Sequence, residues 1–348
     1  MLVVMCLIYG LNIADRYVVS TVLEPIRWRP RPLSRIKSAP SGPPYGVLVS
    51  KIVSCQILAA FMACGTEAQV TVVNRDAHFP EGPIWYHDKL YYVEYDRNTV
   101  MTWDGRENAV FASDPGCGQS AVVPTAAGEF LTTCYDNGSI GRMAADGKLL
   151  PPYTRDKDGN PFVGPNDLAP DRHGGVYFTA SGHPGPARDA RVFYIAADGT
   201  ISLVADDLHN ANGVAVSRDG KTLYVVETEE NRLLQFAIGP DARLSNRRLF
   251  VNLNALTHHV TPIWPDGIKI DSAGKIYIGQ SPRDVKAALS GKIFVVDADA
   301  KWVRTLTLPS PNVPNFAFSP DEKTLYVTAL DQIGKSPYLG KVYAIPNN

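Results

Sequence analysis

The sequence lacks an excess of charge of either sign, because 34 basic and 35 acidic residues leave a formal net charge of -1 at pH 7. Proteins that bind nucleic acids or anionic membranes electrostatically present a basic patch or segment to them. The charge balance therefore favours a small-molecule partner, with no nucleic acid and no membrane contact by the folded domain. No signal for an oligomer is present.

Uninterrupted membrane-length apolar runs and long amphipathic helices are also lacking. The apolar residues 1–14 are followed by Asp15 and Arg16, so they make a poor membrane span by themselves. Beyond residue 68, no segment shows the apolar periodicity of a long helix. Hydrophobic residues make up 45% of the chain and charged residues 20%, as in a globular protein. All-β folds of this length can form a single domain.

The first 68 residues are expected to lie outside the globular fold. Residues 27–44 are basic and rich in proline, which is typical of a disordered linker. Residues 51–68 contain a charged residue, an apolar run and a small-residue stretch in the order of a secretory signal peptide. Residues 1–50 then belong either to an over-extended gene model or to a genuine N-terminal membrane anchor. Both interpretations place residues 69–348 outside the cytoplasm, in the periplasm or secreted.

Six copies of one short motif follow at intervals of about 40 to 50 residues. In each copy, turn residues precede a β-rich run: DKLYYVE (88–94), GEFLTTC (128–134), GGVYFTA (174–180), GKTLYVVE (220–227), GKIYIGQ (274–280) and EKTLYVTA (322–329). A strand-like segment stands before each run and another after it. Six such units without helices predict an all-β fold, a six-bladed β-propeller. The last unit ends after its third strand, so residues 71–76 are expected to supply its outer strand and to remove an open edge.

One polar residue stands at the same place in each unit, 10 to 12 positions before an aromatic or leucine residue of the β-rich run. These residues are Glu81, Ser120, Asn166, Asn212, Asp266 and Asn315. The first strand of each propeller blade lines the central channel, so the six side chains are expected to form a ring around the axis.

Two carboxylates held together in such a ring would repel each other unless a cation lay between them. The ring offers only oxygen ligands, which favours a hard divalent ion, and calcium accepts six to eight of them. We therefore predict a calcium site at Glu81, Asn166, Asn212 and Asp266, supported by Ser120 and Asn315. The alternative is a set of polar residues around channel water, with the Asn-Gly and Asp-Gly pairs read singly as turns.

Four segments resemble the regucalcin and gluconolactonase (senescence-marker-protein-like) family, and more distantly diisopropylfluorophosphatase and the paraoxonases. They are FPEGPIW around Glu81, FVGPNDLAPDRHGGVYFT around Asn166, NANGVAVSRDGKTLYVVET around Asn212 and PDGIKIDSAGKIYIG around Asp266. Their order and spacing match the family from about His78 to Ile345. The resemblance implies an axial metal site at which a lactone or similar small ester is hydrolysed.

Carried over residue by residue, the resemblance implies that Glu81, Asn212 and Asp266 are the core metal ligands. It implies that Asn166 is a further ligand or a substrate contact and that Asp167 is a substrate contact. The segment FTAS, residues 178–181, departs from the many relatives that carry an acidic residue after the aromatic-Thr pair. This departure bears on which substrate is bound.

Hydrolysis also needs a base within hydrogen-bond reach of the attacking water, and Asp266 is the candidate. His258 and His259 precede the Asp266 strand and could lie over the channel mouth, where they would contact the substrate or take the proton instead. A solvated loop is the other interpretation of these two histidines.

Two other functions fit the same ring of residues. A phosphotriesterase would use the same cation. A non-catalytic binding propeller would keep the cation only as a structural element.

Two of the five cysteines lie in the predicted propeller, Cys117 and Cys134. If Pro124 faces Glu129 across their hairpin, Cys134 faces Gln119 and Cys117 is a diagonal neighbour, about 7 to 8 Å away. A bulge or bend near the strand end would bring the pair into bonding range. An exported protein favours oxidation, so we predict a disulfide, with two free thiols as the alternative.

Overall fold

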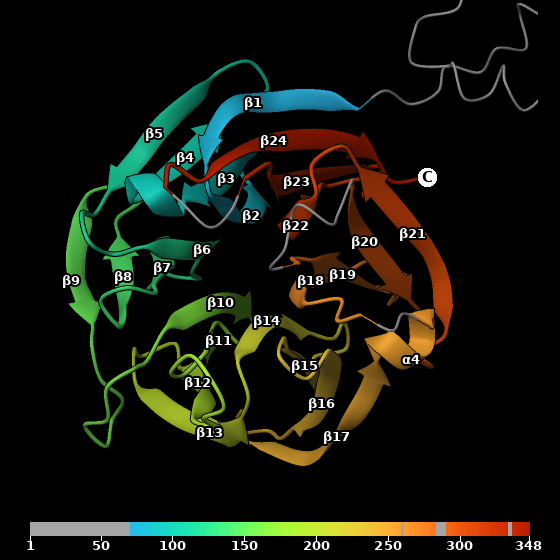
Figure 1. The fold of residues 1–348 in the computed structure, drawn as a ribbon. Helices are drawn as coiled ribbons and strands as arrows, with labels where there is room; N and C mark the ends of the chain where they lie inside the picture. The colour runs from blue at the N-terminus through green and yellow to red at the C-terminus, as the bar shows by residue number, and fades with distance from the viewer. Residues whose placement is uncertain (1–69, 259–260, 283–289, 333–335) are drawn as a thin grey trace, which may run out of the picture. The chain divides into compact units, whose positions relative to one another are not determined.

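The computed structural model describes residues 70–348 except 259–260, 283–289 and 333–335. The expected N-terminal extension (residues 1–50), the signal-peptide-like segment (residues 51–68) and His259 lie outside the described residues. The described part of the chain forms six four-stranded antiparallel sheets arranged around a central axis (Figure 1). The six-bladed β-propeller predicted from the repeats is therefore confirmed.

Each blade begins with its innermost strand and proceeds outward. Blade 1 contains β2 (Pro80–Tyr86), β3 (Lys89–Glu94), β4 (Thr99–Trp103) and β5 (Asn108–Ser113). Blade 2 contains β6 (Gln119–Pro124), β7 (Phe130–Cys134), β8 (Ser139–Met143) and β9 (Leu149–Tyr153). Blade 3 contains β10 (Pro165–Pro170), β11 (Val176–Ala180), β12 (Ala190–Ile195) and β13 (Ile201–Leu208). Blade 4 contains β14 (Ala211–Val216), β15 (Thr222–Glu227), β16 (Arg232–Ile238) and β17 (Leu244–Asn252). Blade 5 contains β18 (Pro265–Ile270), β19 (Ile276–Gln280), β20 (Gly291–Val296) and β21 (Trp302–Leu308). Blade 6 contains β22 (Asn312–Phe318), β23 (Thr324–Leu330), β24 (Leu339–Pro346) and, outermost, β1 (Thr71–His78).

Blade 6 is built from both ends of the propeller. Its outer strand β1 pairs antiparallel with β24, and Thr71 lies opposite Ala344. Figure 1 shows β1 running along β24 at the rim of the ring. The prediction that residues 71–76 complete the last blade is therefore correct.

The hydrophobic core lies between neighbouring blades. All residues of β7 and β11 are buried, because each of these strands is covered on both faces. Leu131 and Val176 belong to one cluster that joins blades 2 and 3, and the stacked rings of Trp85 and Tyr326, 5.1 Å apart, join blades 1 and 6. Burial on both faces explains why these strands read as short continuous apolar runs rather than as strict alternation.

Helical structure is scarce in the described part of the chain, where it includes η2 (Tyr95–Arg97) and α4 (Leu253–Thr257). None of the described residues belongs to a helix with the length and apolar character needed to cross a membrane.

Candidate active site

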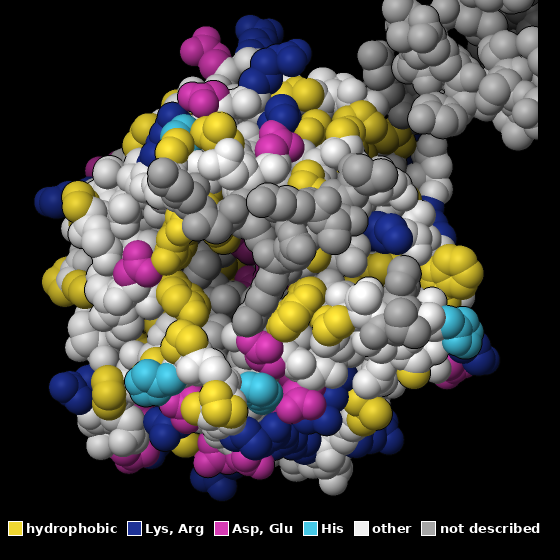
Figure 2. Space-filling model, viewed as in Figure 1, with side chains coloured by type: hydrophobic (Ala, Val, Ile, Leu, Met, Phe, Trp, Pro, Cys, Tyr) yellow, Lys and Arg dark blue, Asp and Glu magenta, His cyan; other side chains and the backbone are white. Residues whose placement is uncertain are grey.

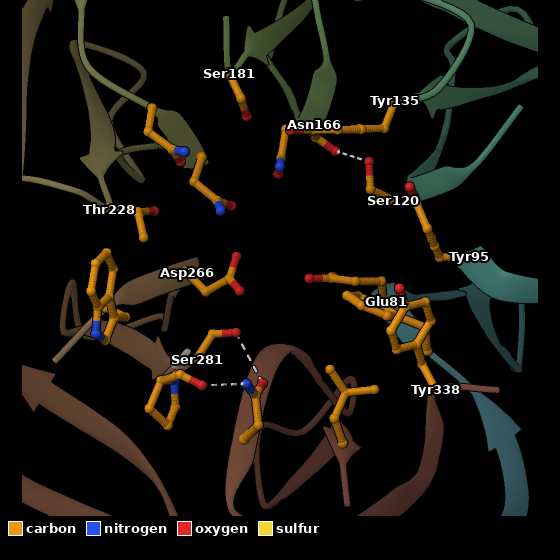
Figure 3. Close-up of a pocket in the computed structure, with 17 residues that line it drawn as sticks. Glu81, Tyr95, Ser120, Tyr135, Asn166, Ser181, Thr228, Asp266, Ser281 and Tyr338 are labelled. Atoms are coloured by element: carbon orange, nitrogen blue, oxygen red, sulfur yellow. Dashed lines mark hydrogen bonds between the residues drawn. The ribbon is translucent and has the colours of Figure 1, made fainter. Parts of the chain in front are cut away.

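A cavity of about 380 Å3 opens at the end of the channel where the innermost strands begin. The structure brings five of the six predicted ring residues to it: Glu81, Ser120, Asn166, Asn212 and Asp266. Figure 3 shows the side chains of Glu81, Asn166 and Asp266 pointing into this shared space. The space-filling view shows a hollow near the centre of the same face, with hydrophobic side chains along its left edge (Figure 2).

The register of the first hairpin in each blade places these five residues. Each lies three positions before the residue that pairs with the aromatic or leucine side chain of the second strand. The pairs are Ile84 with Tyr91, Val123 with Leu131, Ala169 with Tyr177, Ala215 with Tyr224 and Lys269 with Tyr277. Because side chains alternate along a strand, a constant offset brings all five to the same face.

Blade 6 departs from this register. Ala317 pairs with Tyr326, and the residue three positions before Ala317 is Pro314. Counting back along the sequence from Tyr326 predicts Asn315, which is one residue later. A shift of one residue turns the side chain to the other face of the strand. Asn315 is accordingly 2% exposed, and its Oδ1 accepts a hydrogen bond from the next backbone N–H at 2.9 Å. It does not line the cavity, to which blade 6 instead contributes Asn312, Leu330 and Tyr338, the residue directly before β24.

Hydroxyl groups of one blade hold the ring residues of the next. Thr133 Oγ1 donates a hydrogen bond to the carbonyl oxygen of Asn166 at 2.7 Å. Thr179 Oγ1 donates to the carbonyl oxygen of Asn212 at 2.6 Å. These partly buried bonds tie the backbone of Asn166 and of Asn212 to the preceding blade.

The Asn-Gly and Asp-Gly pairs of the ring lie inside strands β14 and β18. A Cβ on Gly213 would stand 2.3 Å from the carbonyl oxygen of Asp266, and a Cβ on Gly267 would stand 2.3 Å from Cγ of Asn315. Glycine is therefore required because adjacent innermost strands approach too closely for a side chain. The alternative interpretation of these pairs as turns is wrong.

The two carboxyl groups of the cavity perturb each other. Burial, followed by the charge of Asp266, raises the pKa of Glu81 well above its ordinary value. Enclosure raises the pKa of Asp266 to about 7, although hydrogen bonds from Ser281 and Asn212 act in the opposite direction. Both carboxyl groups therefore resist simultaneous ionisation unless a positive charge joins them.

Asp167 lies on the other side of β10 from its neighbour Asn166. It is 2% exposed and lines a second cavity, of about 320 Å3, toward the opposite ends of the innermost strands. Its carboxylate accepts hydrogen bonds from the backbone N–H groups of Leu168 and Val214, and Lys269 Nζ lies 3.8 Å away. The structure therefore places Asp167 in the wall of the channel and not among the residues that line the first cavity, where we expected a substrate contact.

The residues around the channel fit one divalent cation. Three carboxylates and one ammonium group, when all are ionised, leave a net charge of -2: Glu81, Asp167, Asp266 and Lys269. One divalent ion would balance this charge. The four predicted ligands offer carboxylate and amide oxygens, which suit a hard ion such as calcium.

His258 is not brought to the cavity. It follows the short helix α4, is exposed, and is absent from the lining of the first cavity. Among the described residues, Asp266 is therefore better placed than His258 to act as a base.

A second set of residues that line the first cavity was not predicted from the sequence. Each lies four positions after the aromatic or leucine residue of the second strand: Tyr95, Tyr135, Ser181, Thr228, Ser281 and Leu330. The sequence contained enough information to find these residues. Counting four positions forward from the same aromatic or leucine residue that located the ring reaches all six. The residue types differ so widely that only their common position identifies them.

Cys117 and Cys134 form a disulfide at the start of blade 2, with Cα atoms 4.4 Å apart. Gln119 pairs with Cys134, as the sequence predicts, and the register of the hairpin shifts directly after Gln119. This irregularity lies beside the cysteines, where we expected a bulge or bend to bring them into bonding range.

The register at the turn of that hairpin differs from the expected one. Pro124 pairs with Phe130 and not with Glu129. The expected pairing of Gln119 with Cys134 holds nonetheless, because the later shift compensates for the difference at the turn.

The disulfide gives a first testable prediction. Peptide mapping of the unreduced, alkylated protein is expected to find Cys117 linked to Cys134. Replacing both residues by serine is expected to lower the free energy of unfolding by about 3 kcal/mol, the estimate for a loop of roughly 15 residues. Reduced wild-type protein serves as the control and should match the variant, whereas alkylation of both cysteines without reduction would contradict the bond.

Comparison with known proteins adds the following findings. The sequence model of the SMP-30/Gluconolactonase/LRE-like region matches residues 79–331. Pentonolactonase XacC of Haloferax volcanii is 27% identical over 267 residues, which cover 74% of this chain and 83% of the relative. The gluconolactonase of Zymomonas mobilis is 23% identical over 296 residues, which cover 75% of this chain and 78% of the relative.

Two solved structures share the fold. A gluconolactonase from Xanthomonas campestris superposes with a TM-score of 0.65 at 23% identity, over 83% of this chain and 92% of the other. A calcium-binding protein from Agrobacterium tumefaciens, described as regucalcin, superposes with a TM-score of 0.65 at 18% identity, over 80% and 93% of the two chains.

Proposed function

Since the chain belongs to the SMP-30/Gluconolactonase/LRE-like family, we propose that it hydrolyses lactones with the help of one calcium ion held between Glu81 and Asp266. The observation that carries the proposal is the pair of enclosed carboxyl groups with raised pKa values in a cavity that also presents amide oxygens. Relatives named as lactonases and a structural neighbour described as calcium-binding support it.

The residues of the chain have separable roles in this proposal. Glu81, Asn166, Asn212 and Asp266 would hold the ion. When bound, a divalent cation polarises a carbonyl group and stabilises negative charge that develops on its oxygen. Asp266 would accept the proton of the attacking water on its carboxylate, which Ser281 and Asn212 orient by hydrogen bonds.

A substrate panel tests the proposal. Aldonolactones, aryl esters and phosphotriesters are offered to the calcium-loaded protein, and kcat/KM is measured for each. Lactones are expected to be the best substrates. Faster turnover of phosphotriesters would favour the phosphotriesterase alternative, and no turnover of any of the three classes would favour a non-catalytic binding propeller.

The pKa values of Glu81 and Asp266 predict how calcium stabilises the protein at different pH. Both values are raised on folding, so between about pH 4 and pH 7 the folded metal-free protein binds more protons than the unfolded chain. The free energy of unfolding of the metal-free protein therefore falls as pH rises through this window. Calcium binds the ionised carboxylates, so the calcium-loaded protein does not lose this free energy of unfolding as pH rises.

Scanning calorimetry of metal-free and calcium-loaded protein at pH 5 and pH 8 measures the effect. Calcium is expected to raise Tm by about 5 °C more at pH 8 than at pH 5, which corresponds to a few kcal/mol in a chain of this size. An equal calcium effect at the two pH values would count against the proposed ligands.

We also propose that residues 69–348 function outside the cytoplasm, in the periplasm or after secretion. Disulfides persist in oxidising compartments, so the bond between Cys117 and Cys134 supports this location.

A further inference from the structure

The residue two positions before each cavity-lining ring residue has a left-handed backbone in five blades. These residues are Phe79 (φ 51°), Gly118 (φ 61°), Gly164 (φ 59°), Asn210 (φ 52°) and Trp264 (φ 58°). In each blade, the carbonyl oxygen of this residue accepts a hydrogen bond from the backbone N–H of the residue after the second strand, at 2.8 to 3.2 Å. The same turn is thus repeated around the channel, and it requires a positive φ.

Glycine and asparagine are the residues that adopt this conformation most readily, and bulky side chains rarely do. Phe79 and Trp264 adopt it although each precedes a proline, which further disfavours helical backbone conformations. Their backbones are held on both sides. Phe79 N donates to the carbonyl oxygen of Tyr338 at 2.7 Å, and Trp264 N donates to Asn231 Oδ1 at 2.8 Å. Since glycine or asparagine satisfies the turn in the other blades, the turn itself does not require an aromatic side chain.

The side chain of Phe79 belongs to a group of aromatic rings in the cavity, which we term the aromatic wall: Phe79, Tyr95, Tyr135 and Tyr338. Phe79 lies 5.1 Å from Tyr95 and 5.6 Å from Tyr338 between ring centroids, and Tyr95 lies 6.4 Å from Tyr135. The wall is separate from the hydrophobic clusters between the blades, of which none of its four residues is a member. Its rings line the ligand cavity rather than contributing to these core clusters.

The opposite side of the cavity has a different character. The positions that carry Tyr95 and Tyr135 in blades 1 and 2 carry Ser181, Thr228 and Ser281 in blades 3 to 5. Figure 3 shows Tyr95, Tyr135 and Tyr338 on the Glu81 side of the cavity, and Ser181, Thr228 and Ser281 on the Asp266 side. A ligand between the two carboxylates would therefore meet four aromatic rings on one side. On the other it would meet small hydroxyl groups together with Trp264, which lies two residues before Asp266 and also lines the cavity.

We propose that the aromatic wall binds an apolar ring or side group of the substrate, so that the preferred substrate is a lactone carrying an aromatic or aliphatic substituent. Aromatic side chains stack face to face with an offset or edge to face with ring centroids about 4.5 to 7 Å apart. Apolar pockets with a few polar groups orient such ligands. Phe79, at a turn that does not require an aromatic side chain, places its ring in this wall. The inference rests on the proposed lactone hydrolysis and adds the class of lactone.

Two lactones that differ only in the substituent test the proposal: γ-phenyl-γ-butyrolactone and γ-butyrolactone. The full-length calcium-loaded protein is expected to have the higher kcat/KM for the phenyl compound. In Phe79→Asn, which suits the left-handed backbone, the ratio of the two kcat/KM values is expected to fall by about 10-fold, mainly through KM. Tyr338→Ala is expected to lower the same ratio and serves as a second variant if Phe79→Asn does not fold. Trp302→Asn, which removes an exposed aromatic side chain of the outer strand β21, is the matched control and should leave the ratio unchanged.

A purely structural role of the wall would lower Tm without changing the ratio of the two substrates. An unchanged ratio in a folded Phe79→Asn or Tyr338→Ala protein would overturn the proposal, as would a wild-type preference for the unsubstituted lactone. If the wild-type protein hydrolyses neither compound, the proposed function fails for these lactones, and binding of the matching γ-lactams, measured by calorimetry, decides the inference. Tighter binding of the phenyl lactam that is lost in Phe79→Asn supports the wall as a binding surface, and equal binding of the two lactams overturns it.

Discussion

Treatment with a chelator is expected to abolish lactone hydrolysis, and added calcium is expected to restore it. Without a cation, the enclosed carboxyl groups of Glu81 and Asp266 hold protons or repel each other, because their pKa values are raised. The described lining of the cavity contains no Lys or Arg side chain that could stabilise an oxyanion in place of the ion. Removal of a cation that supplies several kcal/mol of transition-state stabilisation corresponds to a loss of about 1000-fold or more.

The measurement is kcat/KM for an aldonolactone before and after dialysis against a chelator, and again after calcium is added back. Magnesium provides a comparison, since it demands tighter octahedral geometry and is expected to restore less activity. Circular dichroism of the dialysed protein separates loss of the ion from loss of the fold. Full activity in folded, demetallated protein would exclude the proposed mechanism.

Asp266→Asn is expected to reduce kcat/KM by more than about 100-fold. The variant keeps an oxygen ligand but removes one negative charge and the proposed base, each of which matters to the reaction. Changes outside the direct ligands of a metal already cost about 10 to 100-fold at comparable sites, so a change to a ligand should cost more.

Asp299→Asn is the matched control, because it makes the same chemical change at an exposed aspartate of the turn between β20 and β21. Calcium binding is measured by calorimetry in both variants, so that a lost ion and a lost base can be distinguished. Wild-type turnover by calcium-loaded Asp266→Asn would exclude Asp266 as the base.

The sequence predicts most of the fold because each blade repeats one short hairpin. The second strands begin at turn residues and contain apolar runs, so six copies at a regular interval specify a propeller without any knowledge of long-range contacts. The closing strand could be predicted as well, because one blade was short of a strand and residues 71–76 had the required pattern.

The errors arose where counting along the sequence could not detect a change in strand register. In blade 6, the pairing of Ala317 with Tyr326 moves the expected position by one residue and turns Asn315 out of the ring. In blade 2, the turn pairs Pro124 with Phe130, and a later shift hides the difference. Register depends on how the backbone bends at a bulge, and the sequence does not report this bend directly.

The aromatic wall was missed for another reason. Phe79 belongs to the recognised FPEG segment, but nothing in the sequence indicates its left-handed backbone, because phenylalanine before proline normally disfavours it. The signal exists only in the comparison of five equivalent turns, where glycine or asparagine replaces it in three blades.

The pairing of β1 with β24 also determines when the ring can be completed. During synthesis, β1 is among the first parts of the propeller to leave the ribosome, and its partner β24 is the last, since Thr71 pairs with Ala344. Five blades can form from continuous chain, whereas the sixth must wait until β24 has been made. A chain that stops before residue 339 leaves β1 without its hydrogen-bonding partner, and such an unpaired strand is a template for association with other chains. The eight residues of β24 thus decide whether the ring closes, because only a chain that includes them can pair β1 and complete the sixth blade.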